Sequence, residues 1–373
     1  MHIIASPDHA LHDPPCEIID GQITPYYEMP RRVAIIRAAL AEAGFPVPQP
    51  PRSFGVEPLL AVHMPDYLAY LERAYGEWIA AGKPPEALLP STWPLGGMRS
   101  RSGAVVGEAG RYCFDLSAPI VKGTYAAARA SADCALTAAD LLLGGAQAAY
   151  ALCRPPGHHA MPALAGGYCY LNNAAIAANY LACTGEAFAH HPDPRNGASR
   201  ANASPLHVHW AIDTSAVALL DIDFHHGNGS QAIFYERSDV FFTSIHGDPD
   251  REYPYFAGFA DERGSGVGEG YNLNIPLAAA IDNQSYLSAL EQATSAIAAY
   301  SPRYLVVSAG LDTFQGDPLG DFAVTSEGFG LIGQRIAALG LPTLFVQEGG
   351  YAIDELGKNL VTLLQGFMKE QNT

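Results

Sequence analysis

The chain has 373 residues, of which 49% are hydrophobic and 16% are charged, so it can bury a large core and is not expected to be disordered. Its 21 Lys and Arg against 38 Asp and Glu give a formal charge of −17, which opposes binding to nucleic acid or to an acidic membrane. This charge would attract a cationic ligand, although it could also serve solubility alone.

The N-terminal stretch "MHIIASPDHALHD" has no basic segment followed by a long apolar one. Nowhere does the chain approach the roughly 18 consecutive apolar residues of a membrane span. The six cysteines include no Cys-x-x-Cys pair, which indicates neither a disulfide framework nor a thiolate zinc site. We therefore expect a cytoplasmic protein with reduced thiols.

Two segments have residues that typically begin or end helices. Residues 30–44 open with Pro30 and close at Gly44, and residues 124–145 end in a glycine pair. Short apolar runs bounded by glycine and proline predict buried strands at 148–156, 217–223, 239–247, 303–310 and 342–350.

Strands that alternate with helices predict an α/β fold with a central parallel sheet and helices on both faces. Ionisable residues follow four of the five runs, at the carboxyl ends of the predicted strands, and folds of this class bind ligands at that edge of the sheet. One active site built from all of them implies a single domain over residues 1–373. Residues 184–210, rich in Pro, Asn, Ser and Ala, predict a surface loop insertion in it, whose four histidines could bind an adventitious metal.

The stretch "DIDFHHGNG" (221–229) predicts a metal site. Alternate residues of an extended strand point to the same side, so Asp221, Asp223 and His225 would share a face if the strand persists. Asp223, His225 and Asp312 would supply two oxygens and one nitrogen and leave room for water and substrate, as catalytic zinc requires. A water bound to such an ion has a pKa near 7 and is a usable nucleophile.

Tandem histidines in "RPPGHHA" (154–160) suit proton transfer, because one imidazole can take a proton from the attacking water and later pass it to a leaving amine. Asp221 could hold His158 by a hydrogen bond, and Asn228 could do the same for His159. In "QEGGY" (347–351), Tyr351 on its glycine turn could donate a hydrogen bond to an oxyanion. Together these groups predict metal-assisted hydrolysis of an amide.

Five motifs closely resemble the zinc-dependent deacetylases of the arginase–deacetylase superfamily: "RPPGHHA", "GGYCYLNN", "DIDFHHGNG", "SAGLDTFQGDPLG" and "QEGGY". The likeness covers nearly the whole chain, and its N-terminal half looks most like bacterial acetylpolyamine amidohydrolases. The resemblance implies the same zinc ligands, with His158 and His159 as the proton-transfer pair and Tyr351 as the group that polarises the carbonyl.

The resemblance also implies a narrow tunnel for an extended acyl-amine chain, lined by Gly167, Tyr168 and Tyr253. It implies a structural potassium ion near the zinc, held by Asp221, Asp223, His225, Ser244 and the carbonyl of Ile245. A second potassium ion would be held by the carbonyls of Phe234, Arg237, Val240 and Tyr271.

Some positions depart from the polyamine pattern. Val106 and Ser117 stand where acetylpolyamine amidohydrolases carry acidic residues that recognise distant ammonium groups, and Leu319 stands where a polyamine-selective eukaryotic member carries glutamate. Asp115 matches the rim aspartate with which protein-lysine deacetylases hold a substrate backbone, and Glu108 is a nearby acidic candidate.

We therefore expect a zinc-dependent amidohydrolase whose partner is a small cationic acetylated amine, with no nucleic acid and no membrane, and we leave a homodimer open. One alternative is an acetyl-lysine deacetylase, and another is a non-catalytic module that binds acyl-lysine. Arginase-like chemistry is disfavoured, because its binuclear site uses the order Asp-x-His-x-Asp and a further Asp where this chain has Phe314.

Overall fold

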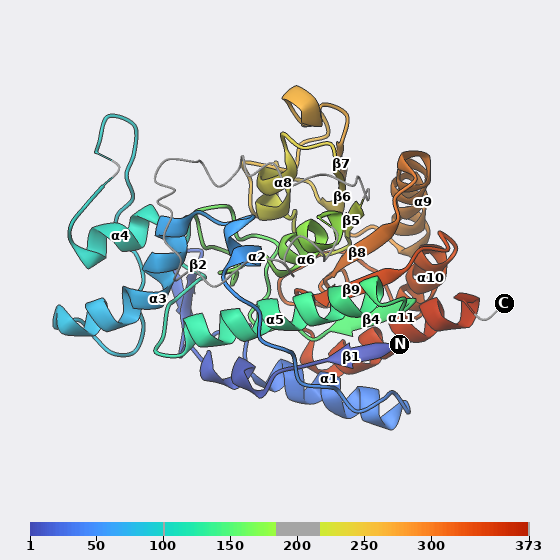
Figure 1. Ribbon diagram of the computed structural model, residues 1–373, viewed down its shortest axis with the longest axis horizontal. Coiled ribbons are helices and arrows are strands. Elements are labelled where there is room, and N and C mark those ends of the chain that lie inside the picture. The colour runs from blue at the N-terminus through green and yellow to red at the C-terminus, as the bar shows by residue number, and fades with distance from the viewer. Residues whose placement is uncertain (100, 184–216, 372–373) are drawn as a thin grey trace, which may run out of the picture.

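We describe the chain from a computed structural model, which covers residues 1–99, 101–183 and 217–371. Seven parallel strands form one sheet in the order β1-β4-β9-β8-β5-β6-β7 (Figure 1). These strands are β1 (His2–Ile4), β4 (Ala148–Ala151), β5 (Val217–Asp221), β6 (Val240–Gly247), β7 (Asn272–Leu277), β8 (Tyr304–Ala309) and β9 (Thr343–Gln347). A separate antiparallel hairpin consists of β2 (Glu17–Ile19) and β3 (Gln22–Thr24).

Helices connect the strands and cover the sheet. They are α1 (Arg31–Glu42), α2 (Glu57–Leu60), α3 (Pro65–Ala80), α4 (Val105–Arg111), α5 (Thr124–Leu143), α6 (Asn173–Ala182), α8 (Asn228–Phe234), α9 (Asn283–Tyr300), α10 (Ser326–Ala337) and α11 (Ile353–Gln371). Among the described residues, short 3₁₀ turns lie at Pro7–Leu11 and Gly266–Gly268.

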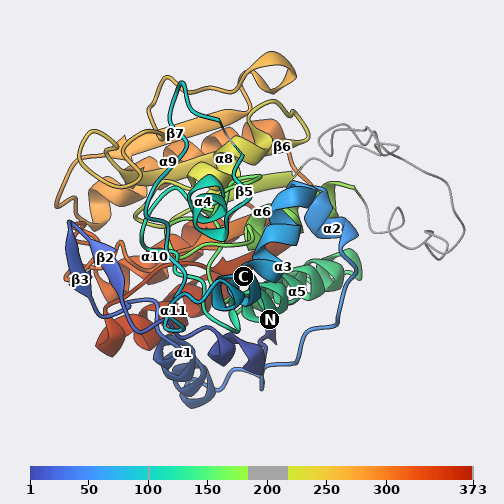
Figure 2. The same cartoon turned by 90° about the vertical axis from the view of Figure 1, so that its left-hand side faces the viewer.

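Both faces of the sheet are buried. On β5, Val217 and Leu219 belong to the core that includes α3, α5 and α6, whereas Ala218 and Leu220 belong to the core that includes α1, α9, α10 and α11. Figure 2 shows α5 and α6 on one side of the sheet and α1, α10 and α11 on the other. A strand covered on both faces is apolar at every position, which explains the unbroken run "VALL".

The predicted α/β fold class, with a parallel sheet between helices, is confirmed. The helices predicted at 30–44 and 124–145 correspond to α1 and α5, and Gly44 and Gly145 follow them with φ of 78° and 97°. All five predicted strands are present. The edge strands β1 and β7 were not predicted, since β1 has only three residues and β7 carries polar asparagines and a proline.

The carboxyl ends of the strands meet at one edge of the sheet. In Figure 1 they point to the left, where the β2–β3 hairpin, α3 and α4 lie. The segments that end or directly follow β4, β5, β8 and β9 carry the motifs noted in the sequence. The loop predicted at 184–210 lies outside the described residues.

Each of the six cysteines is free. Among the residues that the structure describes, no helix combines the length and apolar character needed to cross a membrane.

Candidate active site

Three metal-binding side chains meet at the carboxyl ends of β5 and β8. The ligand atoms of Asp223, His225 and Asp312 lie within 4.8 Å of one another. His225 Nδ1 lies 3.2 Å from Asp223 Oδ1 and 3.2 Å from Asp312 Oδ2. Both carboxylates are fully buried. Two carboxylates and one imidazole form a donor set that suits zinc and leaves coordination positions open.

The strand does not stay extended through this motif. It ends at Asp221, and the chain then bends, with Asp223 N donating to Asp221 Oδ1 at 3.1 Å and His225 N donating to Asp223 Oδ1 at 2.9 Å. Asp223 and His225 therefore reach Asp312, while Asp221 lies beside His158 instead. The sharing of one face by all three residues, expected for a continued strand, does not occur.

Two glycines let the backbone pass close to the metal ligands. A Cβ at Gly310 would lie 2.0 Å from Asp223 Oδ2, and one at Gly349 would lie 2.3 Å from Asp312 Oδ2. Gly349 N also donates to Asp223 Oδ2 at 2.9 Å. A larger residue at either position would displace a ligand carboxylate.

The three ligands are electrostatically coupled. Burial opposes the charged form of His225, but the Asp223 and Asp312 carboxylates raise its pKa to about 10. Burial and the charge of Asp223 raise the pKa of Asp312 to about 7. Two buried carboxylates this close repel each other, and a divalent cation between them would remove that repulsion.

The two histidines of "RPPGHHA" lie beside this trio. His158 Nδ1 is 3.0 Å from Asp221 Oδ2, and His159 Nδ1 is 2.7 Å from Asn228 Oδ1, the partners that the sequence predicts. The two imidazole rings are 3.9 Å apart between centroids. Each Nδ1 is occupied by an oxygen partner, so each Nε2 is the nitrogen free to exchange a proton.

Their surroundings shift the two pKa values in opposite directions. Burial alone would lower the pKa of His158, but Asp223 and Asp221 raise it to about 10. Burial, followed by the charges of His158 and His225, lowers the pKa of His159 well below its usual value. A metal ion beside both rings would lower the pKa of His158, since it adds a positive charge. Two proton-transfer groups held at different pKa values suit acid and base roles.

Tyr351 completes the group from the loop after β9. Its backbone N donates to Asp317 Oδ2 at 2.7 Å, and the Arg32 guanidinium lies 4.9 Å from the centre of its ring. Gly350 before it has φ of 115°, a conformation that favours glycine. Burial raises the pKa of Tyr351 well above its usual value, so its hydroxyl stays protonated and can donate a hydrogen bond.

A pocket of about 290 Å³ gives access to these groups. Its lining includes His158, His159, His225 and Tyr351, together with Asp115, Gly167, Tyr168, Tyr253 and Leu319, which the resemblance assigns to the substrate tunnel. A larger groove of about 1010 Å³ beside α8 contains none of the catalytic or zinc-binding candidates. We therefore place the reaction in the smaller pocket.

Gly167 and Asp115 shape its wall. A Cβ at Gly167 would lie 2.2 Å from His159 Cδ2, so only glycine fits there. Asp115 Oδ2 accepts hydrogen bonds from Gly167 N at 2.7 Å, Tyr253 Oη at 2.8 Å and Ser117 Oγ at 2.7 Å, and Oδ1 accepts one from Ser117 N at 3.1 Å. The resemblance implies that Asp115 holds a substrate backbone, but its carboxylate already bonds to three residues of the pocket lining.

Comparison with known proteins identifies the family. The model of the histone deacetylase domain matches residues 26–190 and 188–367. The chain belongs to the histone deacetylase family. Acetylpolyamine amidohydrolase 2 of Pseudomonas aeruginosa is 45% identical over 98% of both chains, and the acetylpolyamine amidohydrolase of Mycoplana ramosa is 40% identical over 98% of this chain and 99% of that one. The crystal structure of acetylpolyamine aminohydrolase from Burkholderia pseudomallei superposes with a TM-score of 0.87 at 40% identity, covering 99% of each chain.

The structure places the positions that the sequence analysis compares with acetylpolyamine amidohydrolases. Ser117 lines the pocket and is bonded to Asp115, whereas Val106 lies on α4 and is not part of the lining. Glu108 is not in the lining either, and its carboxylate is paired with Arg73 at 2.9 Å. Glu108 is therefore a poor candidate for recognising a substrate.

Sequence reasoning missed two acidic residues of this pocket. Asp20, at the turn between β2 and β3, and Glu252, eight positions after Ser244, both line it. Burial and then these two carboxylates raise the pKa of Tyr255, so both act on its hydroxyl. Neither acid lies in a motif, and only the folded chain brings them together.

Sequence reasoning missed three further residues, which lie outside the pocket lining and bond to the backbone of the segments that carry the catalytic candidates: Arg32, Asp317 and Glu348. Asp317 and Glu348 lie in the quoted motifs "SAGLDTFQGDPLG" and "QEGGY", and Arg32 lies at the start of α1, but the partners of each residue are far away in the chain. Arg32 donates to the carbonyls of Glu348 and Gly350 at 2.7 and 2.8 Å.

Proposed function

We propose that this chain is a zinc-dependent amidohydrolase that removes acetyl groups from small acetylated polyamines and diamines. The observation that carries the proposal is that Asp223, His225 and Asp312 lie together, with the His158–His159 pair and Tyr351 around the same pocket. The relatives at 40–45% identity that carry the name acetylpolyamine amidohydrolase support the substrate class.

Asp223, His225 and Asp312 would hold the ion, and their two oxygens and one nitrogen fit zinc. Zinc bound there would polarise the substrate carbonyl and lower the pKa of a water molecule. Native iron or cobalt would use the same ligands. Of these three residues, only His225 forms part of the pocket lining.

The side chains around the pocket divide the proton transfers. One imidazole of the His158–His159 pair takes the proton of the attacking water at Nε2, and a proton is later delivered to the departing amine nitrogen. Asp221 and Asn228 keep the rings oriented through their Nδ1 atoms. Tyr351 donates its hydroxyl hydrogen to the oxygen that develops negative charge as the carbonyl carbon becomes tetrahedral.

A cationic substrate fits the entrance of the pocket. Glu252 is half-buried, and no side chain among the described residues donates a hydrogen bond to its carboxylate. Burial and the nearby Asp321 raise the pKa of Glu252, so a positive charge would stabilise it. Asp20 and the aromatic ring of Tyr255 offer further contacts for an ammonium group.

The second candidate is an acetyl-lysine deacetylase, favoured by Val106 and Ser117 at positions where acids would recognise polyamines. The internal bonds of Asp115 weigh against it, because that carboxylate has little capacity left for a peptide backbone. A silent acyl-lysine binding module is disfavoured, since every group needed for hydrolysis lies around the pocket.

A panel of acetylated amines tests the function. We expect kcat/KM for N-acetylputrescine, N-acetylcadaverine or N-acetylspermidine to exceed that for an acetyl-lysine peptide, with all turnover abolished by a chelator. Raising the ionic strength should lower kcat/KM for N-acetylputrescine and barely affect a neutral acetyl-lysine derivative blocked at both ends. Efficient cleavage of acetyl-lysine peptides beside negligible turnover of every acetylated amine would favour the second candidate.

We also propose the first potassium site. Asp221 pairs in register with Ser244 on β6 and with Ser308 on β8. The Ser308 hydroxyl is buried and has no hydrogen-bond partner among the described residues, so oxygen atoms are available beside a buried carboxylate. The melting temperature should then be higher in KCl than in NaCl at equal ionic strength.

We also propose the second potassium site. Phe234 ends α8, Val240 begins β6, and Tyr271 directly precedes β7. The carbonyls of Phe234 and Tyr271 already accept backbone hydrogen bonds at 2.9 and 3.0 Å, and each has a second lone pair. A cytoplasmic location is likewise a proposal, supported by six free cysteines.

A further inference from the structure

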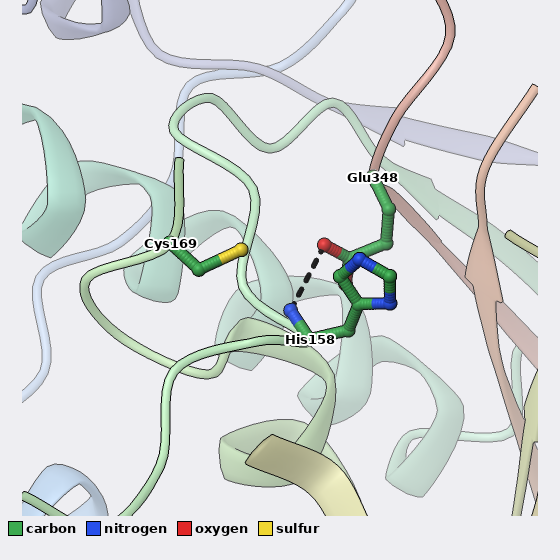
Figure 3. A group of neighbouring side chains, drawn as sticks. All are labelled: His158, Cys169 and Glu348. Atoms are coloured by element: carbon green, nitrogen blue, oxygen red, sulfur yellow. Dashed lines mark hydrogen bonds between the residues drawn. The ribbon is translucent and has the colours of Figure 1, made fainter. Parts of the chain in front are cut away.

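Glu348 is the first residue after β9, and its side chain is completely buried. It is neither one of the three zinc-binding candidates nor part of the pocket lining. Its carboxylate turns toward the loop that follows β4. Glu348 Oε2 accepts a hydrogen bond from Gly157 N at 2.6 Å. It accepts a second one from His158 N at 3.2 Å (Figure 3).

The backbone of Glu348 is fixed on both sides. Its carbonyl accepts a hydrogen bond from Arg32 Nη2 at 2.7 Å, and its N donates to the carbonyl of Ala309 at 3.2 Å. β4 and β9 are neighbours in the sheet, with Ala151 opposite Val346. The carboxylate therefore joins the loop that carries the histidines to a well-anchored strand end.

A metal site is the competing interpretation of this cluster. Ligand atoms of His158, Cys169 and Glu348 lie within 4.8 Å of one another, and Figure 3 shows the three side chains converging. However, His158 Nδ1 is bonded to Asp221, and Glu348 Oε2 is bonded to two N–H groups. Burial raises the pKa of Cys169 well above its usual value, so it is a thiol, which is a poor ligand.

We propose that Glu348 is a positioning residue for the His158–His159 pair and acts through the N–H groups of Gly157 and His158. These two N–H groups are buried and would lack a partner without the carboxylate. The catalytic rings directly follow this peptide segment, so a shift of the loop moves both rings. The inference rests on the proposed hydrolysis at the same site.

Two variants separate the hydrogen bonds from the charge. Glu348→Gln keeps one acceptor oxygen at the same reach, and its NH₂ group would replace Oε1, which has no partner among the described residues. Glu348→Leu removes the acceptor. We expect Glu348→Gln to stay within about threefold of the wild-type kcat, and Glu348→Leu to lose about 10²-fold in kcat with little change in KM or zinc content.

A second readout does not depend on activity. Hydrogen exchange measured by mass spectrometry should be at least about tenfold faster in the segment 154–160 of Glu348→Leu, and near wild type in Glu348→Gln. Thr343→Val is the matched control, because Thr343 is buried at the other end of β9 and donates one hydrogen bond to the carbonyl of Leu341. It should lower the melting temperature and leave kcat unchanged.

Several results would overturn the positioning role: a wild-type kcat in Glu348→Leu, unchanged exchange in that segment, or an equally large loss in Glu348→Gln. If Glu348→Leu does not fold, Glu348→Asp replaces it, since it keeps the charge and shortens the reach. If Glu348→Asp were active and Glu348→Gln had lost most of its kcat, the negative charge of residue 348 rather than its hydrogen bonds would be what catalysis requires, and the positioning role would be overturned. If the wild type cleaves no acetylated amine but the exchange pattern is as expected, the proposed function fails and the positioning role stands.

Discussion

The guanidinium of Arg32 lies over the ring of Tyr351, 4.9 Å from its centre, and donates to the carbonyls of Glu348 and Gly350 on the N-terminal side of that tyrosine. The same guanidinium is paired with Glu28 at 2.7 Å, and both side chains are buried. Tyr351 is thus held on the side of Arg32 by a charged group that is not itself part of the pocket lining.

Arg32→Lys should keep the positive charge and lose this geometry, because an ammonium group cannot donate in the fork that reaches two carbonyls and Glu28. We expect kcat to fall by about tenfold or more. The free energy of unfolding should fall by a few kcal/mol, because the buried carboxylate of Glu28 loses its ion pair with the Arg32 guanidinium. Steady-state kinetics and urea unfolding measure the two effects. Wild-type values of both would show that the contacts of Arg32 are dispensable.

Asp312→Ala should remove metal and activity together, because Asp223 and His225 alone make a two-ligand site. Plasma mass spectrometry should find about one zinc per chain in the wild type and far less in the variant. Two transition metals per wild-type chain would instead move the assignment toward the arginase branch.

Tyr351→Phe should retain zinc and lose about 10²-fold to 10³-fold in kcat, the effect of removing one donor to the oxyanion. The Phe ring keeps the packing against Arg32 and Tyr168, so KM and the melting temperature should change little. An unchanged kcat would mean that the tyrosine only packs.

Glu252→Gln should lower kcat/KM for N-acetylputrescine by about fivefold, because a partly solvated ion pair contributes on the order of 1 kcal/mol. A neutral, doubly blocked acetyl-lysine derivative should be cleaved at the wild-type rate. Glu42→Gln serves as the control, since Glu42 is an exposed acid at the end of α1. Equal losses for the charged and neutral substrates would contradict a contact between Glu252 and an ammonium group.

Stability should depend on pH through Glu17. Burial raises its pKa from 4.5 to about 7, so the folded carboxyl binds a proton more tightly than the unfolded one. The free energy of unfolding should therefore fall as the pH rises from about 4.5 to about 7, by about 2 kcal/mol for this group. Glu17→Gln should remove that part of the slope in urea unfolding, whereas replacing the exposed Glu77 by Gln should not. An identical slope in both variants would contradict the assignment to Glu17.

The central strands and the zinc-binding candidates were predictable because their signals are local. A strand buried on both faces is a continuous apolar run, and each ligand directly follows such a run. Parallel strands bring those ends to one edge without further information. The same reasoning could not locate β1 and β7, because edge strands are short or polar and resemble loops.

The supporting residues were beyond sequence reasoning for a different reason. Arg32 and Glu348 are 316 positions apart, and their bond exists only because α1 packs against the end of β9. Asp115 looked like a rim residue that faces substrate, but its four hydrogen bonds depend on where Tyr253 and Gly167 come to lie. Glu252 has no local pattern at all. A side chain's partners decide such roles, and they are set by tertiary packing.

The position of β9 has a consequence for how the molecule is made. β9 lies between β4 and β8, yet it follows both in the chain, so those strands cannot reach their final places until it inserts. Tyr351 and Glu348 arrive with it. During synthesis the pairings of β9 with β4 and β8 can therefore form only after one of the last segments of the chain has left the ribosome. Pairing between strands so distant in the sequence is slow. A nascent chain that ends before β9 therefore contains Asp223, His225 and Asp312 but lacks Tyr351, so by the proposed mechanism it cannot yet catalyse hydrolysis.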